Sequence, residues 1–340
     1  MEILIITAVK IIIVVLIILT TVANLVWVER RLSAAIQNRI GPNRVGPFGL
    51  LQSPADVLKL FLKEDIVPAS ANKFVHTLAP IISIAVAMTT FAVIPFGDRI
   101  ALFGWNIKLL IADVNIGVLY ILAMTSLGVY GVTLSGWASN NKYSLLGGIR
   151  SSAQLISYEL SMGLSVIGVI MLAGSLRLDR IVELQSGLAW NAFLTPIGFI
   201  TFVVASFAET NRLPFDLPEA EPELVGGYHT EYSGMKFGTF FLAEYANMIT
   251  SSALIVTLFL GGWQVPYLDV LHLSPLATSI VQVAAFVVKV SALLFFYMWI
   301  RWTIPRFRYD QLMNLGWKVM LPLAILNVAV TGGWMLLFGY

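Results

Sequence analysis

Cysteine is absent from this 340-residue sequence. Without cysteine the chain cannot form a disulfide, hold an iron–sulfur cluster through thiolates or attach a c-type haem. The three histidines, His76, His229 and His272, lack the close spacing of metal ligands. We therefore expect this chain to hold no metal and no cofactor of its own.

Charged residues are also scarce, at 12% of the sequence, against about 25% in ordinary soluble domains. Hydrophobic residues make up 58%. This composition excludes an ordinary soluble protein and predicts membrane lipid as the surroundings. We expect no nucleic-acid partner.

Eight stretches of about 20 apolar residues are long enough to cross a bilayer as helices. They lie near 3–28, 74–95, 114–135, 151–173, 189–208, 238–262, 276–300 and 319–338. The sequence therefore predicts an all-α integral membrane protein, in which residues 1–340 form a single polytopic membrane domain of about eight transmembrane helices.

Lysine and arginine are distributed unevenly between the loops. Fifteen of them lie in the loops that follow the first, third, fifth and seventh spans, and four lie in the other loops. Loops rich in Lys and Arg stay on the cytoplasmic side, so we expect cytoplasmic loops at 29–73, 136–150, 209–237 and 301–318. Both termini then face the outer side of the cell inner membrane.

Acidic residues concentrate in the third of these loops. Residues 207–232 contain one arginine, Arg212, and six carboxylates, namely Glu209, Asp216, Glu219, Glu221, Glu223 and Glu231. Proline at every fourth position disfavours helix, so we expect an extended run in which Glu219, Glu221 and Glu223 share a face. Such a rigid anionic segment beside a membrane indicates work on protons or cations, or docking to another protein.

The first cytoplasmic loop has two parts. Glycine and proline between residues 41 and 49 exclude a helix there. After them, Ser53 is a candidate N-cap, and the apolar residues that follow predict a short amphipathic helix along the membrane interface. This helix either anchors the loop in lipid or forms one wall of a site for an amphiphilic ligand.

The ionisable residues within or at the end of predicted spans include Glu159, Glu209, Glu244 and Lys289. Ionisable groups are costly in hydrocarbon, so they face a cavity, pair with one another or mark a proton path. Three interpretations stay open: proton transfer, a structural pair such as a glutamate with Lys289, or a contact to another subunit. The basic loop at 301–318 either anchors the chain at the membrane surface or neutralises part of the acidic segment.

Four segments together resemble one family: subunit 1, also called the H subunit, of NADH–quinone oxidoreductase, or respiratory complex I. The similar segments are ERRLSAAIQNRIGPNRVGPFGLLQSPADVLKLFLKED at 29–65, SNNKYSLLGGIRSSAQLISYELSMG at 139–163, FAETNRLPFDLPEAEPELVGGYHTEYSG at 207–234 and PRFRYDQLM at 305–313. With the eight spans in order, the resemblance extends over nearly the whole chain.

The resemblance implies a quinone chamber at the junction with the peripheral arm of the complex. Carried over by motif, the chamber residues are Arg30, Gln37, Arg39, Phe48, Phe215, Asp216 and Arg306. The resemblance also implies a carboxylate path that couples quinone reduction to proton translocation. Its residues are Glu159, Glu209, Glu219, Glu221, Glu223 and Glu244, and Lys289 is a further candidate from its place in the seventh span.

The resemblance further implies a subunit of a translocase that is not catalytic alone. Quinone is then the substrate, and FMN and the iron–sulfur clusters are expected in partner subunits. Expected partners are cluster-bearing peripheral-arm subunits on the cytoplasmic face, and small and antiporter-like membrane subunits beside the chain. Alternatives are the membrane subunit of a ferredoxin-, F420- or hydrogenase-linked complex, or an autonomous ion transporter.

Overall fold

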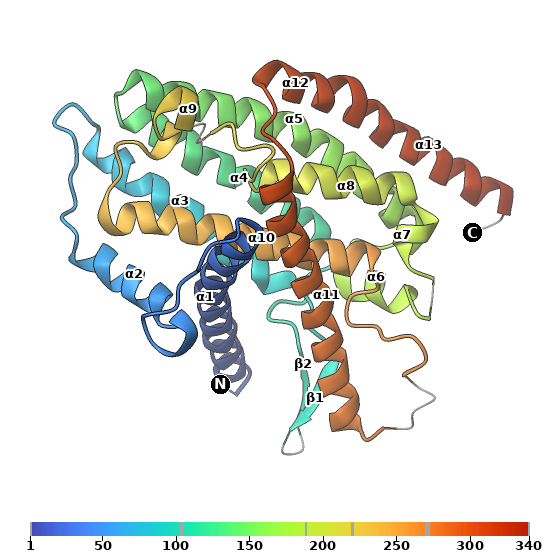
Figure 1. The fold of residues 1–340 in the computed structure, drawn as a ribbon. Helices are drawn as coiled ribbons and strands as arrows, with labels where there is room; N and C mark the ends of the chain where they lie inside the picture. Colours follow the sequence, from blue (N-terminus) through green and yellow to red (C-terminus); the bar gives the residue numbers. More distant parts are fainter. Residues whose placement is uncertain (1, 103–104, 188, 219–220, 269–272, 339–340) are drawn as a thin grey trace.

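The computed structural model describes residues 2–102, 105–187, 189–218, 221–268 and 273–338. Helices form most of this part of the chain, accompanied by one short pair of strands (Figure 1). Seven of the described helices are long and apolar enough to cross a membrane. The predicted fold class is confirmed, and the chain is a multi-pass membrane protein.

The seven long helices correspond to seven of the eight predicted spans. They are α1 (Glu2–Ile36), α3 (Lys73–Thr90), α4 (Gly117–Ala138), α5 (Lys142–Ala173), α10 (Gly234–Phe259), α11 (Pro275–Thr303), and a run of α12 (Tyr309–Asn314), a π-helix (Leu315–Met320) and α13 (Leu321–Phe338).

The remaining predicted span, near 189–208, is helical but interrupted. Thr195, whose backbone is not helical (φ −127°, ψ 64°), separates α7 (Asn191–Leu194) from α8 (Pro196–Glu209). The 14 residues of α8 extend over about 21 Å at roughly 1.5 Å per residue. This is less than the roughly 30 Å of a hydrocarbon core, so α8 alone is shorter than a full span.

Helix α10 lies at the centre of the bundle. Every residue from Met248 to Phe259 is buried, and α10 contacts α3, α8 and α11. The ring of Phe259 packs against Phe199 and Phe202 of α8, with centroids 5.5 and 5.4 Å apart. By contrast, α13 lies along α5 at the edge of the bundle (Figure 1). The polar residues of α10 therefore face protein rather than lipid.

Four connections between the long helices meet at one end of the bundle, which we call the loop face. It comprises residues 37–72, 139–141, 210–218, 221–233 and 304–308. The Asn72 N–H donates to the Ala138 carbonyl (3.0 Å), and the Ser233 hydroxyl donates to the Glu64 carbonyl (2.9 Å). Its position on the cytoplasmic side of a membrane stays a prediction.

The opposite end of the bundle carries a hairpin that the sequence analysis did not predict. The elements there are β1 (Arg99–Leu102), β2 (Trp105–Lys108), which pair antiparallel, and α6 (Leu178–Leu184). Asp113 pairs with Lys108 (2.7 Å) and with Arg177 (2.9 Å), and Arg177 also pairs with Asp179 (2.7 Å). These ion pairs fasten α6 to the hairpin, and the hydrogen bond from Arg177 lowers the pKa of Asp179 below its usual range.

Three long helices extend into the loops predicted at 29–73, 136–150 and 301–318. Helix α1 continues to Ile36, α5 begins at Lys142 and α12 begins at Tyr309. The Tyr143 N–H donates to the Asn141 side chain, which caps α5. The predicted loops are therefore shorter than expected, because polar turns at the ends of the spans remain helical and hydropathy does not detect them.

The predicted amphipathic helix is present as α2 (Gln52–Leu62), but Ser53 does not cap it. The Ser53 hydroxyl instead donates to the Ala23 carbonyl of α1 (2.7 Å). Ser53 therefore fastens α2 to α1, a role that depends on tertiary packing and has no local sequence signal.

The predicted extended run of the acidic segment is wrong where the structure describes it. Residues Glu221–Leu224 form one helical turn, α9, because proline is tolerated in the first turn of a helix. Glu219 lies outside the described residues.

Candidate functional site

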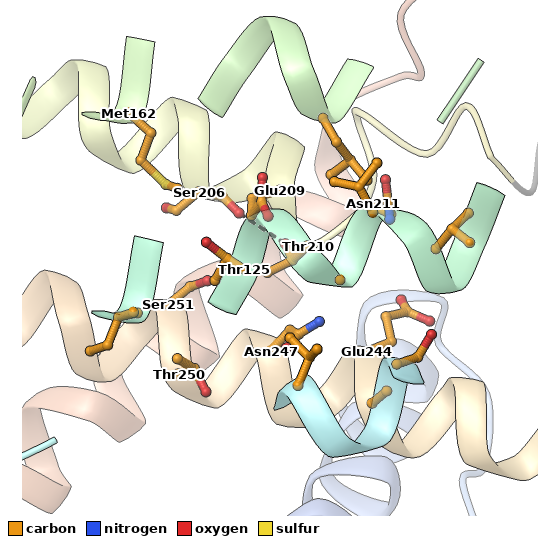
Figure 2. Close-up of a pocket in the computed structure, with 18 of the residues that line it drawn as sticks. Thr125, Met162, Ser206, Glu209, Thr210, Asn211, Glu244, Asn247, Thr250 and Ser251 are labelled. Carbon is orange, nitrogen blue, oxygen red and sulfur yellow. Dashed lines mark hydrogen bonds between the residues drawn. The ribbon is translucent and has the colours of Figure 1, made fainter. Parts of the chain in front are cut away.

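A cavity lies inside the bundle, between α3, α4, α5, α8 and α10, and we call it the polar cavity because polar side chains interrupt its mainly apolar wall. Its volume is about 60 Å³, which leaves room for a few water molecules. Its polar lining consists of Ser83, Thr125, Ser206, Glu209, Thr210, Asn211, Glu244, Asn247, Thr250 and Ser251. Figure 2 shows Ser206 and Glu209 of α8 on one side of it, with Asn247, Thr250 and Ser251 of α10 across from them.

Glu209 lines this cavity as the last residue of α8. Its Oε2 atom is buried and has no hydrogen-bond partner among the described residues. A buried charged oxygen without a partner is costly. Glu209 is therefore the group in the cavity best suited to bind a proton or a water molecule.

Glu159 lies on α5, which packs directly against α8, and its carboxylate acts electrostatically on Glu209. The Ser126 hydroxyl of α4 donates to Glu159 Oε1. Glu244 of α10 lines the same cavity as Glu209. The structure thus brings together the three carboxylates that the sequence analysis selected from the predicted spans.

Glu244 also belongs to a cluster of two acidic and two basic side chains, which we call the ion cluster: Glu29 and Arg212, which are buried, and Glu244 and Arg301, which are half-buried. Arg212 Nε lies 2.7 Å from Glu244 Oε1, and Arg212 Nη1 lies 3.4 Å from Glu29 Oε1. Arg301 of α11 pairs with Glu29 of α1. Two positive and two negative groups therefore share one site with no net charge.

Burial and electrostatics act in opposite directions on Arg212, whose side chain is only 5% exposed. Burial alone would lower its pKa, but the neighbouring Glu244 and Glu29 raise that pKa above its usual value. The Tyr245 ring lies 4.3 Å from the guanidinium, and the Tyr245 hydroxyl donates to Glu29 Oε2 (2.7 Å). Arg212 therefore stays charged and is held on three sides.

The sequence analysis missed several members of this site. Glu29 was assigned to the first loop, and Tyr245 and Asn247 were not selected. The signal for Glu29 was an acid beside Arg30 at the end of an apolar span. Nothing local predicts its pairing with Arg212, which is 183 residues away.

At the loop face, the acidic segment contacts the basic loop. Arg306 pairs with Asp216 (2.7 Å). The Phe215 ring packs against Phe307 and Tyr158, with centroids 5.5 Å apart in both pairs. The structure therefore brings together three predicted chamber residues, Phe215, Asp216 and Arg306, and the basic loop neutralises part of the acidic segment.

The other predicted chamber residues lie on or near the first loop. Arg30 pairs with Asp56 of α2 (2.5 Å), and Arg39 donates to the Gln37 side chain (2.7 Å). Phe48, in the short helix Pro47–Gly49, is 72% exposed. These contacts lie within α1, α2 and the first loop, so they do not join Arg30, Gln37 and Arg39 to Phe215 in one chamber.

An apolar groove lies between α1, α2 and α10, with a volume of about 660 Å³. Its walls include Leu19, Val22, Val57, Phe61, Phe241 and Leu242. Arg30, Asp56 and Tyr245 also line it. The groove therefore has the character of a site for a long apolar molecule with a polar end.

Lys289 lies apart from the carboxylates. Its Nζ donates to the carbonyls of Leu260 (2.8 Å), Gly262 (3.0 Å) and Gln264 (2.8 Å). It therefore satisfies carbonyl groups after the end of α10, and no glutamate of the described residues pairs with it.

The remaining predicted residues lie in the acidic segment. Glu223 pairs with Arg150 of α5 (2.6 Å) at the surface, and Glu221 lies in α9.

Among the described residues, no group of three or more His, Asp or Glu side chains is arranged to hold a metal ion.

Comparison with known proteins identifies the family. Residues 9–332 match the family model described as NADH dehydrogenase. The chain is 54% identical over 312 residues to the NADH-quinone oxidoreductase H 1 subunit of Cytophaga hutchinsonii, covering 92% of this chain and 91% of that relative. The chain belongs to the H-subunit family of NADH-quinone oxidoreductase.

Other proteins with related names are equally similar. "NADH-quinone oxidoreductase subunit 8" of Rhodothermus marinus is 55% identical over 320 residues, covering 91% of each chain. The NADH-quinone oxidoreductase H 2 subunit of Geobacter sulfurreducens is 54% identical over 329 residues, covering 97% of this chain and 96% of the relative. The resemblance carried by the four motifs is confirmed.

The ion cluster predicts that Arg212 is needed for folding. Arg212→Gln leaves Glu29 and Glu244 buried with only Arg301 to balance them, and removing one partner of a buried pair costs about 3–5 kcal/mol. We expect a lower thermal unfolding midpoint and less assembled protein in membranes. The control is Arg180→Gln, because the Arg180 side chain is 65% exposed and exposed pairs contribute about 0–1 kcal/mol.

The double variant Arg212→Gln/Glu244→Gln separates charge balance from packing. It restores a neutral cluster, so we expect it to recover part of the lost stability. If the double variant is no more stable than Arg212→Gln alone, the charge balance of the cluster is not what stabilises this region.

Proposed function

We propose that this chain, as a membrane subunit of an NADH-quinone oxidoreductase, forms much of the quinone chamber and couples quinone reduction to proton translocation. Membership in the complex follows from the family. The chamber and the coupling are our proposal, as is a position in the cell inner membrane with the loop face towards the cytoplasm. The other subunits of the complex are the partners.

One observation carries the proposal: two consecutive residues join the groove to the cavity. Tyr245 lines the apolar groove, and Glu244 lines the polar cavity. Both contact Arg212 of the ion cluster. A polar route therefore runs from the groove through the cluster to Glu209 and then towards Glu159.

The chemistry assigned to the groove fits its lining. A quinone has a long apolar tail and a polar head group, and the groove is apolar with Arg30 and Asp56 in its wall. Phe215, Asp216 and Arg306 at the loop face, together with Phe48, would complete the chamber when peripheral-arm subunits cover them. Those partners would supply the electrons through FMN and iron–sulfur clusters, and this cysteine-free chain has no thiolate to hold such a cluster.

Quinone reduction consumes two electrons and two protons to give quinol. Charge that develops on the quinone would disturb the neutral ion cluster, whose groups lie in a low-dielectric interior where such changes are felt strongly. Glu244 and Arg212 would then shift the proton balance of the cavity. Glu209 would accept or release a proton, and Glu159 would exchange it with the antiporter-like subunits beside the chain.

The relatives favour this proposal over the alternatives. The three relatives described above are 54–55% identical to this chain and are named as NADH-quinone oxidoreductase subunits. This supports NADH as the electron donor of the complex over ferredoxin, F420 or hydrogen. It also supports a complex subunit over an autonomous transporter, and a chain that is not catalytic alone.

The coupling role predicts that Glu209→Gln and Glu159→Gln lower both quinone reduction and proton pumping. Glutamine keeps the shape of the side chain but cannot carry the proton. If proton transfer becomes rate-limiting, we expect both rates to fall by about 100-fold to 10,000-fold. Both rates are measured in membranes and divided by the amount of assembled complex. Glu183→Gln at the hairpin end, whose side chain is 49% exposed, is the control, and wild-type rates in both glutamate variants would sink the coupling role.

If the groove holds the quinone tail, a larger side chain at Val57 should weaken the use of long-tailed quinones more than that of short-tailed quinones. Val57→Trp places a large ring in the groove wall, so we expect the apparent KM for a long-tailed quinone to rise about tenfold. The KM for a quinone with a short tail should change less. Leu58→Trp is the matched control, because Leu58 is the next residue of α2 and lies outside the groove lining. Equal effects of the two substitutions would contradict a tail in this groove.

A further inference from the structure

Gln154 of α5 is fully buried beside the turn that joins α8 to the acidic segment. Its Nε2 atom donates to the Ala208 carbonyl (2.8 Å) and to the Phe215 carbonyl (2.7 Å). A side-chain amide has two N–H groups, so Gln154 uses both to connect the two ends of this turn. The Ala208 carbonyl, in the last turn of α8, also accepts from the Asn211 N–H (3.3 Å), so Gln154 adds to a backbone bond of the same turn.

The turn that Gln154 closes, residues 208–215, carries side chains to three places. Glu209 lines the cavity, Arg212 enters the ion cluster and Phe215 packs between Tyr158 and Phe307. Asn211 takes the left-handed backbone conformation (φ 51°), which reverses the chain at the end of a helix. The relative positions of Glu209 and Arg212 therefore depend on how tightly this turn is closed.

We propose that Gln154 is a positioning residue for proton transfer between the ion cluster and the cavity. It holds the two ends of the turn at a fixed separation and attaches them to α5, the helix that carries Glu159. Gln154 itself transfers no proton. This inference rests on the proposed function, because it assigns Gln154 a part in that same route.

The chain offers a matched control for this proposal. Gln185 is 1% exposed and also uses Nε2 to bridge two carbonyls, those of Ile181 (3.1 Å) and Thr257 (3.0 Å). Its Oε1 accepts from the N–H groups of Asn191 and Gly261. Gln185 therefore makes at least as many buried hydrogen bonds as Gln154, but none of its hydrogen-bond partners belongs to the turn 208–215.

The experiment compares Gln154→Met with Gln185→Met in the whole complex in native membranes. Methionine has nearly the same length but cannot donate a hydrogen bond. We expect the kcat for quinone reduction per assembled complex to fall about tenfold in Gln154→Met, because small misplacements of reacting groups are costly. The apparent KM for quinone should stay near that of the wild type, since Gln154 contacts only the backbone carbonyls and the side chain of the turn.

Gln185→Met should retain the kcat of the assembled complex, even if less complex assembles. A second variant, Gln154→Asn, keeps the amide but is one methylene shorter and cannot reach both carbonyls. It should also lower kcat, and it provides the test if Gln154→Met does not assemble.

Two results would overturn the inference: wild-type kcat in the assembled Gln154 variants, or an equal loss of kcat in Gln185→Met. Glu209→Gln, measured in parallel, separates this inference from the proposed function. If Glu209→Gln lowers quinone reduction and the Gln154 variants do not, only the inference fails. If Glu209→Gln also behaves as the wild type, both fail.

Discussion

The burial of Arg212 between two glutamates constrains most of this protein. An unpaired charge in this position would be very costly, so Glu29, Glu244 and Arg301 must all be in place around it. These residues come from α1, α10 and α11, and Arg212 comes from the segment after α8. The cluster therefore aligns three long helices and one turn at the boundary between the bundle and the loop face.

This alignment has a functional consequence. The cluster lies between an apolar groove and a polar cavity, and adjacent residues of α10, Tyr245 and Glu244, line one space each. A charge change in the groove can therefore alter the cavity without movement of a whole helix. Gln154 adds a second constraint, because it attaches the turn that holds both Arg212 and Glu209 to α5.

Much of the fold could be predicted from the sequence, because hydrophobic length and the distribution of Lys and Arg are local properties. These properties predicted the helical spans, the amphipathic α2 and the association of the four basic loops. The ends of helices were predicted poorly. Helix α5 begins at Lys142, about two and a half turns before the predicted span at 151, where polar residues follow the capping residue Asn141.

The candidate site could be predicted only in part, for a different physical reason. Glu159, Glu209 and Glu244 were detectable because an ionisable residue in an apolar span is conspicuous. Glu29 and Gln154 were not detectable, since their roles depend on partners far away in the sequence. The local pattern around Gln154 is that of an ordinary helix, and only the packed structure shows its two carbonyl partners.

The central claim is that reduction of quinone changes the protonation of a buried carboxyl group in this cavity. The most direct measurement is the infrared difference spectrum of the intact complex, recorded in the carboxyl-stretching region before and after quinone reduction. The account predicts a carboxyl band that is missing in Glu209→Gln and retained in Glu183→Gln. Identical carboxyl bands in the wild type and Glu209→Gln would contradict it.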